Sequence, residues 1–540
     1  MAIASRITKR ALSTFAAAAK LPEAAVAAAG AEAVPAPSSA QHQQQQQVLE
    51  FEDTERLFTG EPSTALVRTL AALQLMSAGP LVDVGLAALR SPAVAASPVV
   101  QAAARATAYK HFCAGETADE AAARVQRLWR GGMGGILDYG IEDAEDGAAC
   151  DRNVAGFLAA VDVAAALPPG SVRQPYITLF FFLRRHPWRA CARSSATEEC
   201  HVGGNPRSAL VDTRIPWESS RSKLNRTAVT ASVCIKITAL CPIALLEKTS
   251  DLLRWQHKNP SVHLPWKQHA FPILSDSSPL YLTPSEPAAL TAEEEHELQL
   301  AHDRLLAVGA RCAEHDIPLL VDAEYASVQP SIDYFTFVGA LACNGGGRPI
   351  VHGTVQAYLR DARDRLEAMV RAAEEERVCL GVKIVRGAYL TREARLAESL
   401  GVPSPIHGSI QDTHDCYNGC AAFLLERVRR GSASVMLATH NVESGQLAAA
   451  RAQELGIGKG DRNLQFAQLM GMADGLSLGL RNAGFQVSKY LPYGPVEHII
   501  PYLIRRAEEN RGLLSASAFD RQLLRKELVR RFKNAVMGRE

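Results

Sequence analysis

The sequence carries almost no excess of charge of either sign. Its 58 Lys and Arg residues nearly balance 57 Asp and Glu residues, which leaves a formal net charge of +1. It also lacks a basic stripe interleaved with aromatic residues. Nucleic-acid-binding surfaces need clustered Lys and Arg, often with stacking aromatic rings. The composition therefore argues against a nucleic acid as partner.

Long apolar runs and paired cysteine motifs are also missing. A membrane-spanning helix needs about 18 or more consecutive apolar residues, and no such run occurs, so only peripheral membrane contact stays open. The 11 cysteines are scattered, and the one close pair, Cys416 and Cys420, has no matching His pair. We therefore expect free thiols in a reducing compartment and no metal site.

Several catalytic signatures are absent. The sequence contains no G-x-x-x-x-G-K-[ST] phosphate-binding loop, no G-x-G-x-x-G after a strand, and no H-E-x-x-H. One G-x-S-x-G match, GLSLG at residues 475–479, falls inside a helical pattern rather than at a strand-to-helix turn. We interpret it as a chance match. Phosphoryl-transfer, zinc-protease and serine-hydrolase chemistry are therefore disfavoured.

The first residues that do carry a signal lie at the N-terminus. MAIASRITKRALSTFAAAAKLP is basic, rich in Ala and Ser, and has no acidic residue before Glu23. This composition is typical of a mitochondrial or chloroplast transit peptide, although an ordinary frayed helix would also fit. The Gln43 to Gln47 run then marks a low-complexity linker. We assign residues 1–48 to the transit peptide and this linker.

The remainder of the chain alternates between two patterns. Residues 49–130 are predicted to form an Ala/Leu-rich helical arm. From residue 131 to 540, short apolar runs alternate with amphipathic helices, which predicts an α/β fold, a (β/α)8 TIM-type barrel. The eight expected strands lie within residues 134–142, 232–240, 317–325, 348–358, 378–389, 434–441, 464–472 and 485–494.

One segment does not fit this barrel. Residues 171–230 hold ten Arg or Lys against four Asp or Glu, and show neither helical nor strand periodicity. An unstructured loop of this length is improbable inside a compact domain. We interpret the segment as an aberrant insertion caused by a faulty gene model, and a genuine lineage-specific insertion is the alternative. If the segment is translated, the product could be catalytically impaired.

Polar and aromatic residues collect toward the carboxyl ends of the expected strands, where barrels of this type place their active sites. They include Lys236, Asp322 with Glu324, Lys383, Tyr389 and Tyr490. Such a set suits a small anionic substrate with an apolar body and a cofactor that supplies the chemistry. The alternative is a lyase that uses Lys236 or Lys383 as a Schiff-base lysine.

The stretch PYLIRRAEENRG adds a pair of cations. At about 100° per residue, Tyr502, Arg505, Arg506 and Glu509 share one side of a helix. Two guanidinium groups presented together can bind a carboxylate or a phosphate. The alternative is a solvated face in which Arg505 pairs with Glu509 one turn later.

Eight motifs in register resemble the proline dehydrogenase family, in particular its plant mitochondrial members. They are CIKITAL, VDAE, TVQAYL, KIVRGAYL, ATHN, FAQLMGMAD, KYLPYGP and YLIRRAEEN. The resemblance implies a distorted (β/α)8 barrel with the final helix across its mouth, and FAD as cofactor. It also implies oxidation of L-proline to Δ1-pyrroline-5-carboxylate, the first step of proline catabolism. Hydride would pass to flavin N5 and electrons to a quinone, with peripheral contact on the matrix side of the inner mitochondrial membrane.

The same resemblance implies roles for individual residues. Lys236, Arg505 and Arg506 match a clamp for the substrate carboxylate, with Asp322 as a supporting acid and Tyr490 beside it. Lys383 matches a cation near flavin N5, and Arg386 a partner of the pyrophosphate. The residues expected to pack around the substrate ring are Tyr389, Leu469, Tyr490 and Tyr502. The expected flavin contacts are Gln356, Lys383, Arg386, Gly387, Thr439, His440, Gln465 and Glu509.

Overall fold

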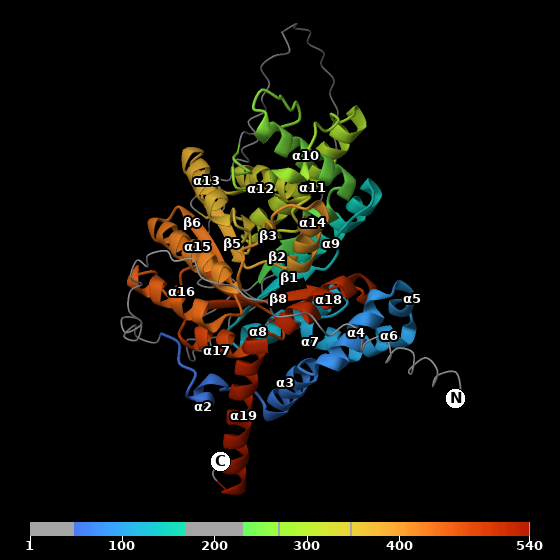
Figure 1. Ribbon diagram of the computed structural model, residues 1–540. Coiled ribbons are helices and arrows are strands. Elements are labelled where there is room, and N and C mark those ends of the chain that lie inside the picture. Colours follow the sequence, from blue (N-terminus) through green and yellow to red (C-terminus); the bar gives the residue numbers. More distant parts are fainter. Residues whose placement is uncertain (1–47, 168–230, 268–270, 346–347, 513, 539–540) are drawn as a thin grey trace, which may run out of the picture. The chain divides into compact units, whose positions relative to one another are not determined.

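The structure, a computed structural model, describes residues 48–167, 231–267, 271–345, 348–512 and 514–538. The predicted transit peptide, except residue 48, and the whole suspected insertion at 171–230 lie outside these residues. The described residues build a closed barrel of eight parallel strands, and Figure 1 shows helices around these strands. Each strand pairs with the next one along the chain, and the last pairs with the first.

All eight predicted strands are confirmed, and each lies within or next to its expected range. They are β1 Gly134–Tyr139, β2 Ala231–Ile235, β3 Leu319–Val321, β4 Val351–Gln356, β5 Leu380–Val385, β6 Ala433–Ala438, β7 Leu464–Leu469 and β8 Gln486–Tyr493. Several strands are buried along their entire length, including β2 and β4. Burial on both faces is what turns a parallel strand into a nearly continuous apolar run, which explains why the sequence revealed these strands.

Helices follow or precede the strands and cover the outside of the barrel. They are α9 Gly147–Ala166, α10 Ile243–Lys258, α11 Ala292–Glu314, α12 Gln329–Cys343, α13 Ala362–Glu375, α14 Leu390–Leu400, α15 Ile410–Arg430, α16 Val442–Glu454 and α17 Asp474–Asn482. Two of them begin with capping boxes, at Thr291 for α11 and Ser409 for α15. The GLSLG serine, Ser477, lies inside α17 and bonds to Gln468 and Ala473, so it is not at a strand-to-helix turn.

The core has an inner and an outer part. Ile136, Cys234, Leu320, Met436 and Ala467, each from a different strand, fill the interior of the barrel. The larger apolar clusters lie between the strands and the surrounding helices. Such a filled barrel has no through-channel, so the site must be built at the ends of the strands.

Helices flank the barrel in the sequence on both sides. Before β1 come α2 Thr54–Leu57, α3 Ser63–Met76, α4 Gly79–Arg90, α5 Pro92–Ala95, α6 Pro98–Ala104, α7 Lys110–Phe112 and α8 Ala118–Arg130. Residues 47–540 form one compact unit, so a domain boundary at residue 130 remains a prediction. Among the described residues, no helix combines the length and the apolar character needed to cross a bilayer.

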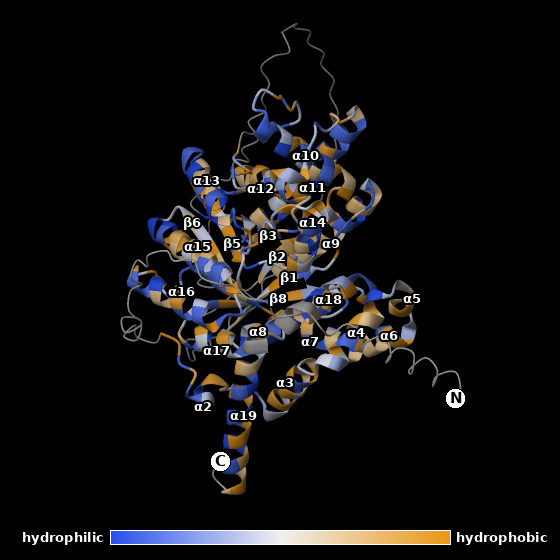
Figure 2. Ribbon diagram, viewed as in Figure 1, coloured by the Kyte–Doolittle hydropathy of each residue, from blue (hydrophilic) through white to orange (hydrophobic). Residues whose placement is uncertain are grey.

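Two helices follow β8. The first, α18 Val496–Gly512, lies at the barrel mouth, because its Arg505 contacts Glu142 just after β1 and its Ile499 lies against Gly140. The second, α19 Leu514–Val536, packs against α2, α3 and α17. Figure 2 shows orange, apolar residues along the inner strands and mixed colours on the flanking helices. The helix at the barrel mouth is thus α18 and not the final helix that the resemblance implies, because α19 follows it.

Candidate active site

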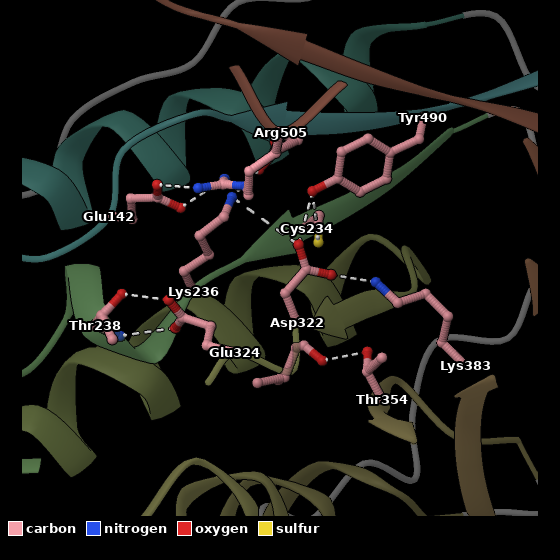
Figure 3. A network of polar contacts seen from close by, with 12 residues as sticks. Glu142, Cys234, Lys236, Thr238, Asp322, Glu324, Thr354, Lys383, Tyr490 and Arg505 are labelled. Atoms are coloured by element: carbon pink, nitrogen blue, oxygen red, sulfur yellow. Dashed lines mark hydrogen bonds and ion pairs between the residues drawn. The ribbon is translucent and has the colours of Figure 1, made fainter. Parts of the chain in front are cut away.

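A buried network of acids and lysines occupies the carboxyl ends of the first strands (Figure 3). Lys236, the residue after β2, is 5% exposed. Its Nζ lies 2.9 Å from Oδ1 of Asp138 on β1 and 3.9 Å from Oδ2 of Asp322, which follows β3. The sequence predicted Lys236 and Asp322 as neighbours, and their placement on adjacent strands brings them together.

Asp322 is the centre of this network. Besides Lys236, it pairs with the Lys383 ammonium from β5, and its Oδ2 accepts a hydrogen bond of 2.7 Å from the Tyr490 hydroxyl on β8. Burial alone would raise the pKa of Asp322, but Lys383 and Lys236 outweigh it and lower that pKa to about 2. Asp322 is therefore a permanent anion that orients two lysines and a tyrosine.

The two lysines stay charged. Burial would lower the pKa of Lys236, yet Asp138 and Asp322 raise it well above its usual value. The pKa of Lys383 is raised as well, because Asp322 outweighs the effect of burial. A Schiff-base lysine needs a neutral amine and hence a lowered pKa. The electrostatics of both lysines therefore argue against the lyase alternative.

Arg505 forms the second half of the anion-binding region. Its two terminal nitrogens donate to the two oxygens of Glu142, at 2.8 and 3.1 Å, and its guanidinium lies 5.5 Å from the centre of the Tyr389 ring. Burial would raise the pKa of Glu142, but Arg505 and Lys236 together lower it. Both cations thus act on the same carboxylate, and Arg505 has Glu142, just after β1, as a partner from outside its own helix.

Arg506 and the predicted ring-packing residues lie next to one another. Arg506 is 5% exposed, and its guanidinium lies 4.9 Å from the centre of the Tyr502 ring. Tyr502, Leu469 and Tyr490 belong to one apolar cluster, whereas Tyr389 packs against a second cluster, the one that contains Tyr325. The structure therefore provides an apolar wall, formed by Leu469, Tyr490 and Tyr502. It lies beside a cationic rim, formed by Lys236 and Arg505.

The predicted flavin contacts gather in the carboxyl-terminal halves of β4 and β5 and just after β5 and β6, with two exceptions. Gln356 ends β4 and donates to the carbonyl oxygen of Glu324 at 2.8 Å. His440 follows β6, and its Nε2 accepts the backbone N–H of Leu469 at 3.1 Å. Burial, helped by Lys489 and other cations, lowers the pKa of His440 to about 3. The His440 ring is therefore neutral. A neutral ring suits a residue that contacts a cofactor better than one that acts as an acid or base near pH 7.

Arg386 and Gly387 follow β5 at the same edge. Arg386 donates to Thr439 Oγ1 and to Ser444 Oγ, both at 2.8 Å. Gly387 has φ +144°, and a Cβ there would lie 2.3 Å from the Tyr358 ring, so only glycine fits. A guanidinium, two hydroxyls and the start of α16 form the kind of donor set that binds a diphosphate. These residues fit the FAD that the resemblance implies.

The remaining two predicted flavin contacts, Gln465 and Glu509, are not seen at this edge of the barrel among the described side chains. Gln465 is the second residue of β7 and lines a small cavity with Arg348, His352 and Arg462. Since His352 is likewise the second residue of β4, this cavity lies at the amino-terminal end of the barrel. The position of Gln465 therefore does not support a flavin contact. Glu509 lies in α18, but its side chain is not among those described.

Three acids of the site had received no role from the sequence. Asp138 and Glu142 partner Lys236 and Arg505, and both belong to the run GGILDYGIE that was expected to be a strand. Their position at the end of that strand was the available signal. Glu324 was noted but given no role. It is 1% exposed, its carboxylate accepts a hydrogen bond of 2.8 Å from the Thr238 hydroxyl, and burial raises its pKa to about 8.

Known proteins resemble this chain in sequence and in fold. The family model described as proline dehydrogenase matches residues 121–519. Proline dehydrogenase 2, mitochondrial, of Arabidopsis thaliana is 45% identical over 489 residues, 89% of this chain and 90% of that protein. Proline dehydrogenase 1, mitochondrial, of the same plant is 44% identical over 489 residues, 89% of this chain and 86% of that protein.

A solved structure shows the same barrel. Proline utilization A (PutA) from Bdellovibrio bacteriovorus, inactivated by N-propargylglycine, matches with a TM-score of 0.53 and 19% identity. The match covers 85% of this chain but 39% of the bacterial protein, and at this identity it supports the fold alone. The family match over residues 121–519 and the 44–45% identity with the two plant relatives show relationship as well as fold. On these grounds, the chain belongs to the proline dehydrogenase family.

Proposed function

We propose that this chain oxidises L-proline to Δ1-pyrroline-5-carboxylate, the first step of proline catabolism, and that it uses FAD. The observation that carries the proposal is the cationic rim of Lys236 and Arg505, both of which act on Glu142, next to an apolar wall of Leu469, Tyr490 and Tyr502. An amino acid with an apolar ring and a carboxylate matches these two surfaces.

The chain's own residues would bind and orient the substrate. Arg505, Arg506 and Lys236 would hold the carboxylate, and a bidentate guanidinium fixes its plane as well as its position. Leu469, Tyr490 and Tyr502 would pack against the ring and exclude water. Because Asp322 binds the Tyr490 hydroxyl at 2.7 Å, the ring of Tyr490 has little freedom to move. This preorganisation would align the substrate carbon that loses hydride.

The cofactor would supply the redox chemistry, because bound FAD accepts a hydride. Gln356, Lys383, Arg386, Gly387, Thr439 and His440 would hold it. Lys383 is charged and buried, so it would place a fixed positive charge at the ends of the strands, where negative charge develops during hydride transfer. Gln465 is not part of this proposal, given its place at the other end of the barrel.

The electron acceptor and location are further parts of the proposal. We propose a quinone as acceptor and peripheral contact with the matrix side of the inner mitochondrial membrane, since both plant relatives are named mitochondrial. Val529, Phe532 and Val536 near the end of α19 are between 52% and 71% exposed. Their spacing puts them on one side of the helix, and exposed apolar residues on one helix face suit a membrane interface.

An anaerobic titration would test the reaction. The visible spectrum of the purified protein should show flavin bands that bleach on addition of L-proline, and reoxidise on addition of a short-chain quinone. Pyrrolidine, which has the same ring without the carboxylate, should bleach them only at far higher concentration, because it cannot use the cationic rim. Folded protein that stays colourless after incubation with FAD would overturn the proposal.

A further inference from the structure

The Arg386 guanidinium is held by three acceptors from three different elements. Besides Thr439 Oγ1 after β6 and Ser444 Oγ on α16, its Nε donates to Nδ1 of His414 on α15 at 3.0 Å. A guanidinium has only donors, so Nδ1 of His414 must be the unprotonated nitrogen. The neutral His414 ring therefore carries its hydrogen on Nε2.

The Nε2–H of His414 faces a second donor. The side-chain nitrogen Nδ2 of Asn441 lies 3.4 Å from His414 Nε2. Asn441 cannot be turned around, because its Oδ1 caps α16 by accepting the backbone N–H of Ser444 at 2.8 Å. Two donors that face each other cannot bond together. Both can be satisfied by one acceptor that lies beside the pair, within hydrogen-bond distance of each nitrogen.

The charge around this pair of donors favours an anion. Arg386 is a cation, and its guanidinium lies over the Tyr417 ring, 4.5 Å from the ring centre, which limits its movement. The first turn of the 13-residue helix α16 adds backbone N–H groups. The nearby acids Asp415 and Glu443 are exposed. Partial burial and Arg386 lower the pKa of His414, which agrees with the neutral ring deduced from its contacts.

We propose that His414 and Asn441 donate hydrogen bonds to the diphosphate of FAD, next to Arg386. This inference rests on the proposed function, because it takes FAD as the cofactor. It adds residues that the sequence did not indicate, since His414 lies on α15 rather than at a strand end. In this arrangement His414 uses one nitrogen to orient Arg386 and the other to contact the ligand.

Two substitutions separate these roles of His414. In His414→Asn the side-chain amide oxygen can replace Nδ1 as acceptor for Arg386, but no donor reaches the position of Nε2. In His414→Gln the longer amide can place an N–H near the position of Nε2. The matched control is His407→Asn, a histidine on the preceding loop whose side chain interacts with Cys416.

The measurement is the dissociation constant of the apoprotein for FAD and for riboflavin, followed by flavin fluorescence. Loss of one hydrogen bond to a charged group should weaken FAD binding about tenfold or more in His414→Asn. Riboflavin has no phosphate, so its affinity should be unchanged. His414→Gln should recover part of the FAD affinity, and His407→Asn should bind both flavins as the wild type does.

Other outcomes overturn the inference in distinct ways. Unchanged FAD affinity in His414→Asn would show that the ring does not contact the diphosphate. Weaker binding in His414→Gln but not in His414→Asn would reduce His414 to a positioning residue for Arg386. Equal losses for FAD and riboflavin would indicate a general structural defect. A wild-type protein that binds neither flavin would instead overturn the proposed function, and this inference with it.

Discussion

Arg505 on α18 and Glu142 after β1 form a bidentate ion pair, with N–O distances of 2.8 and 3.1 Å across 363 residues of sequence. The pair ties the helix after the last strand to the end of the first strand, so it links both ends of the barrel sequence at the mouth. In the proposed site, a substrate carboxylate would have to share or replace Glu142 as partner of Arg505. Substrate binding would then be coupled to the position of α18 through this guanidinium.

Arg505→Met should raise the KM for proline about 10- to 100-fold, because it removes a charged, two-pronged hydrogen bond of roughly 1.5–3 kcal/mol. It should also lower the melting temperature, since Glu142 would remain largely buried without its main partner. Steady-state kinetics and thermal unfolding of the same protein check both effects.

The double variant Arg505→Met with Glu142→Gln is the control for this prediction. It removes the unpaired charge, so the melting temperature should recover, while the KM for proline should stay high because the clamp is still incomplete. Recovery of the KM in the double variant would show that Arg505 serves only to neutralise Glu142. In that case the clamp assignment would be wrong.

The fold could be predicted from the sequence because burial leaves a local trace. Each strand is a short apolar run between helical patterns, and no distant information is needed to see it. The partners of the site are different. Asp138 and Glu142 lie within six residues of each other, but only barrel closure shows that one meets Lys236 and the other meets Arg505. Local patterns do not contain such contacts.

Gln465 is a predicted site residue whose position in its strand does not support the prediction. Alternation along a strand indicates which side chains are buried, but not at which end of the barrel a given residue lies. The predicted strand ran to residue 472, whereas β7 ends at Leu469, and Gln465 is near its start. Leu469, at the carboxyl end of the same strand, does reach the site. The position of a residue relative to the strand end is thus what decides its role.

Glu324→Gln should become more stable relative to the wild type as the pH rises from about 5 to about 8. The pKa of Glu324 is raised from its ordinary value to about 8 because the group is buried and lies near Glu142. The folded wild type therefore keeps a proton that the unfolded chain has lost, and its stability from this group falls as pH rises toward 8. The relative gain should be on the order of 3 kcal/mol.

Chemical denaturation at several pH values measures this difference. Glu376→Gln, an exposed substitution just after α13, is the control and should show no comparable trend. A pH-independent difference between Glu324→Gln and the wild type would mean that Glu324 titrates normally. The buried acid would then not be a neutral group at physiological pH.

Gly387→Ala should lose flavin and stability together. Gly387 has φ +144°, and an added Cβ would lie 2.3 Å from the rigid ring of Tyr358. Because Tyr358 also donates its backbone N–H to the carbonyl oxygen of Arg386 at 2.8 Å, movement of the ring would displace the proposed diphosphate site. The ratio of flavin to protein absorbance and the unfolding free energy check this prediction.

Gly401→Ala provides the matched comparison for the glycine. Gly401 also has a positive φ, +64°, but no atom lies within 4 Å of its Cβ position. It should lose only the conformational cost, about 1 kcal/mol, and retain full flavin content. If both variants behave alike, the contact with Tyr358 has no consequence for cofactor binding.

Asp520→Ala should loosen the attachment of α19 to the barrel. Asp520 is 4% exposed, and its two oxygens accept the backbone N–H groups of Asp474 at 3.1 Å and Gly475 at 3.0 Å, at the start of α17. A carboxylate in this position acts as a helix cap supplied by another helix, and its loss should cost about 1–2 kcal/mol. Hydrogen exchange at the amides of Asp474 and Gly475 should accelerate accordingly.

Asp520→Asn keeps one acceptor and removes the charge that faces Asp474, so its effect should be smaller. Unchanged exchange in Asp520→Ala would show that α17 holds its first turn without Asp520, and the attachment of α19 would then rest on its other contacts, such as those with α2 and α3.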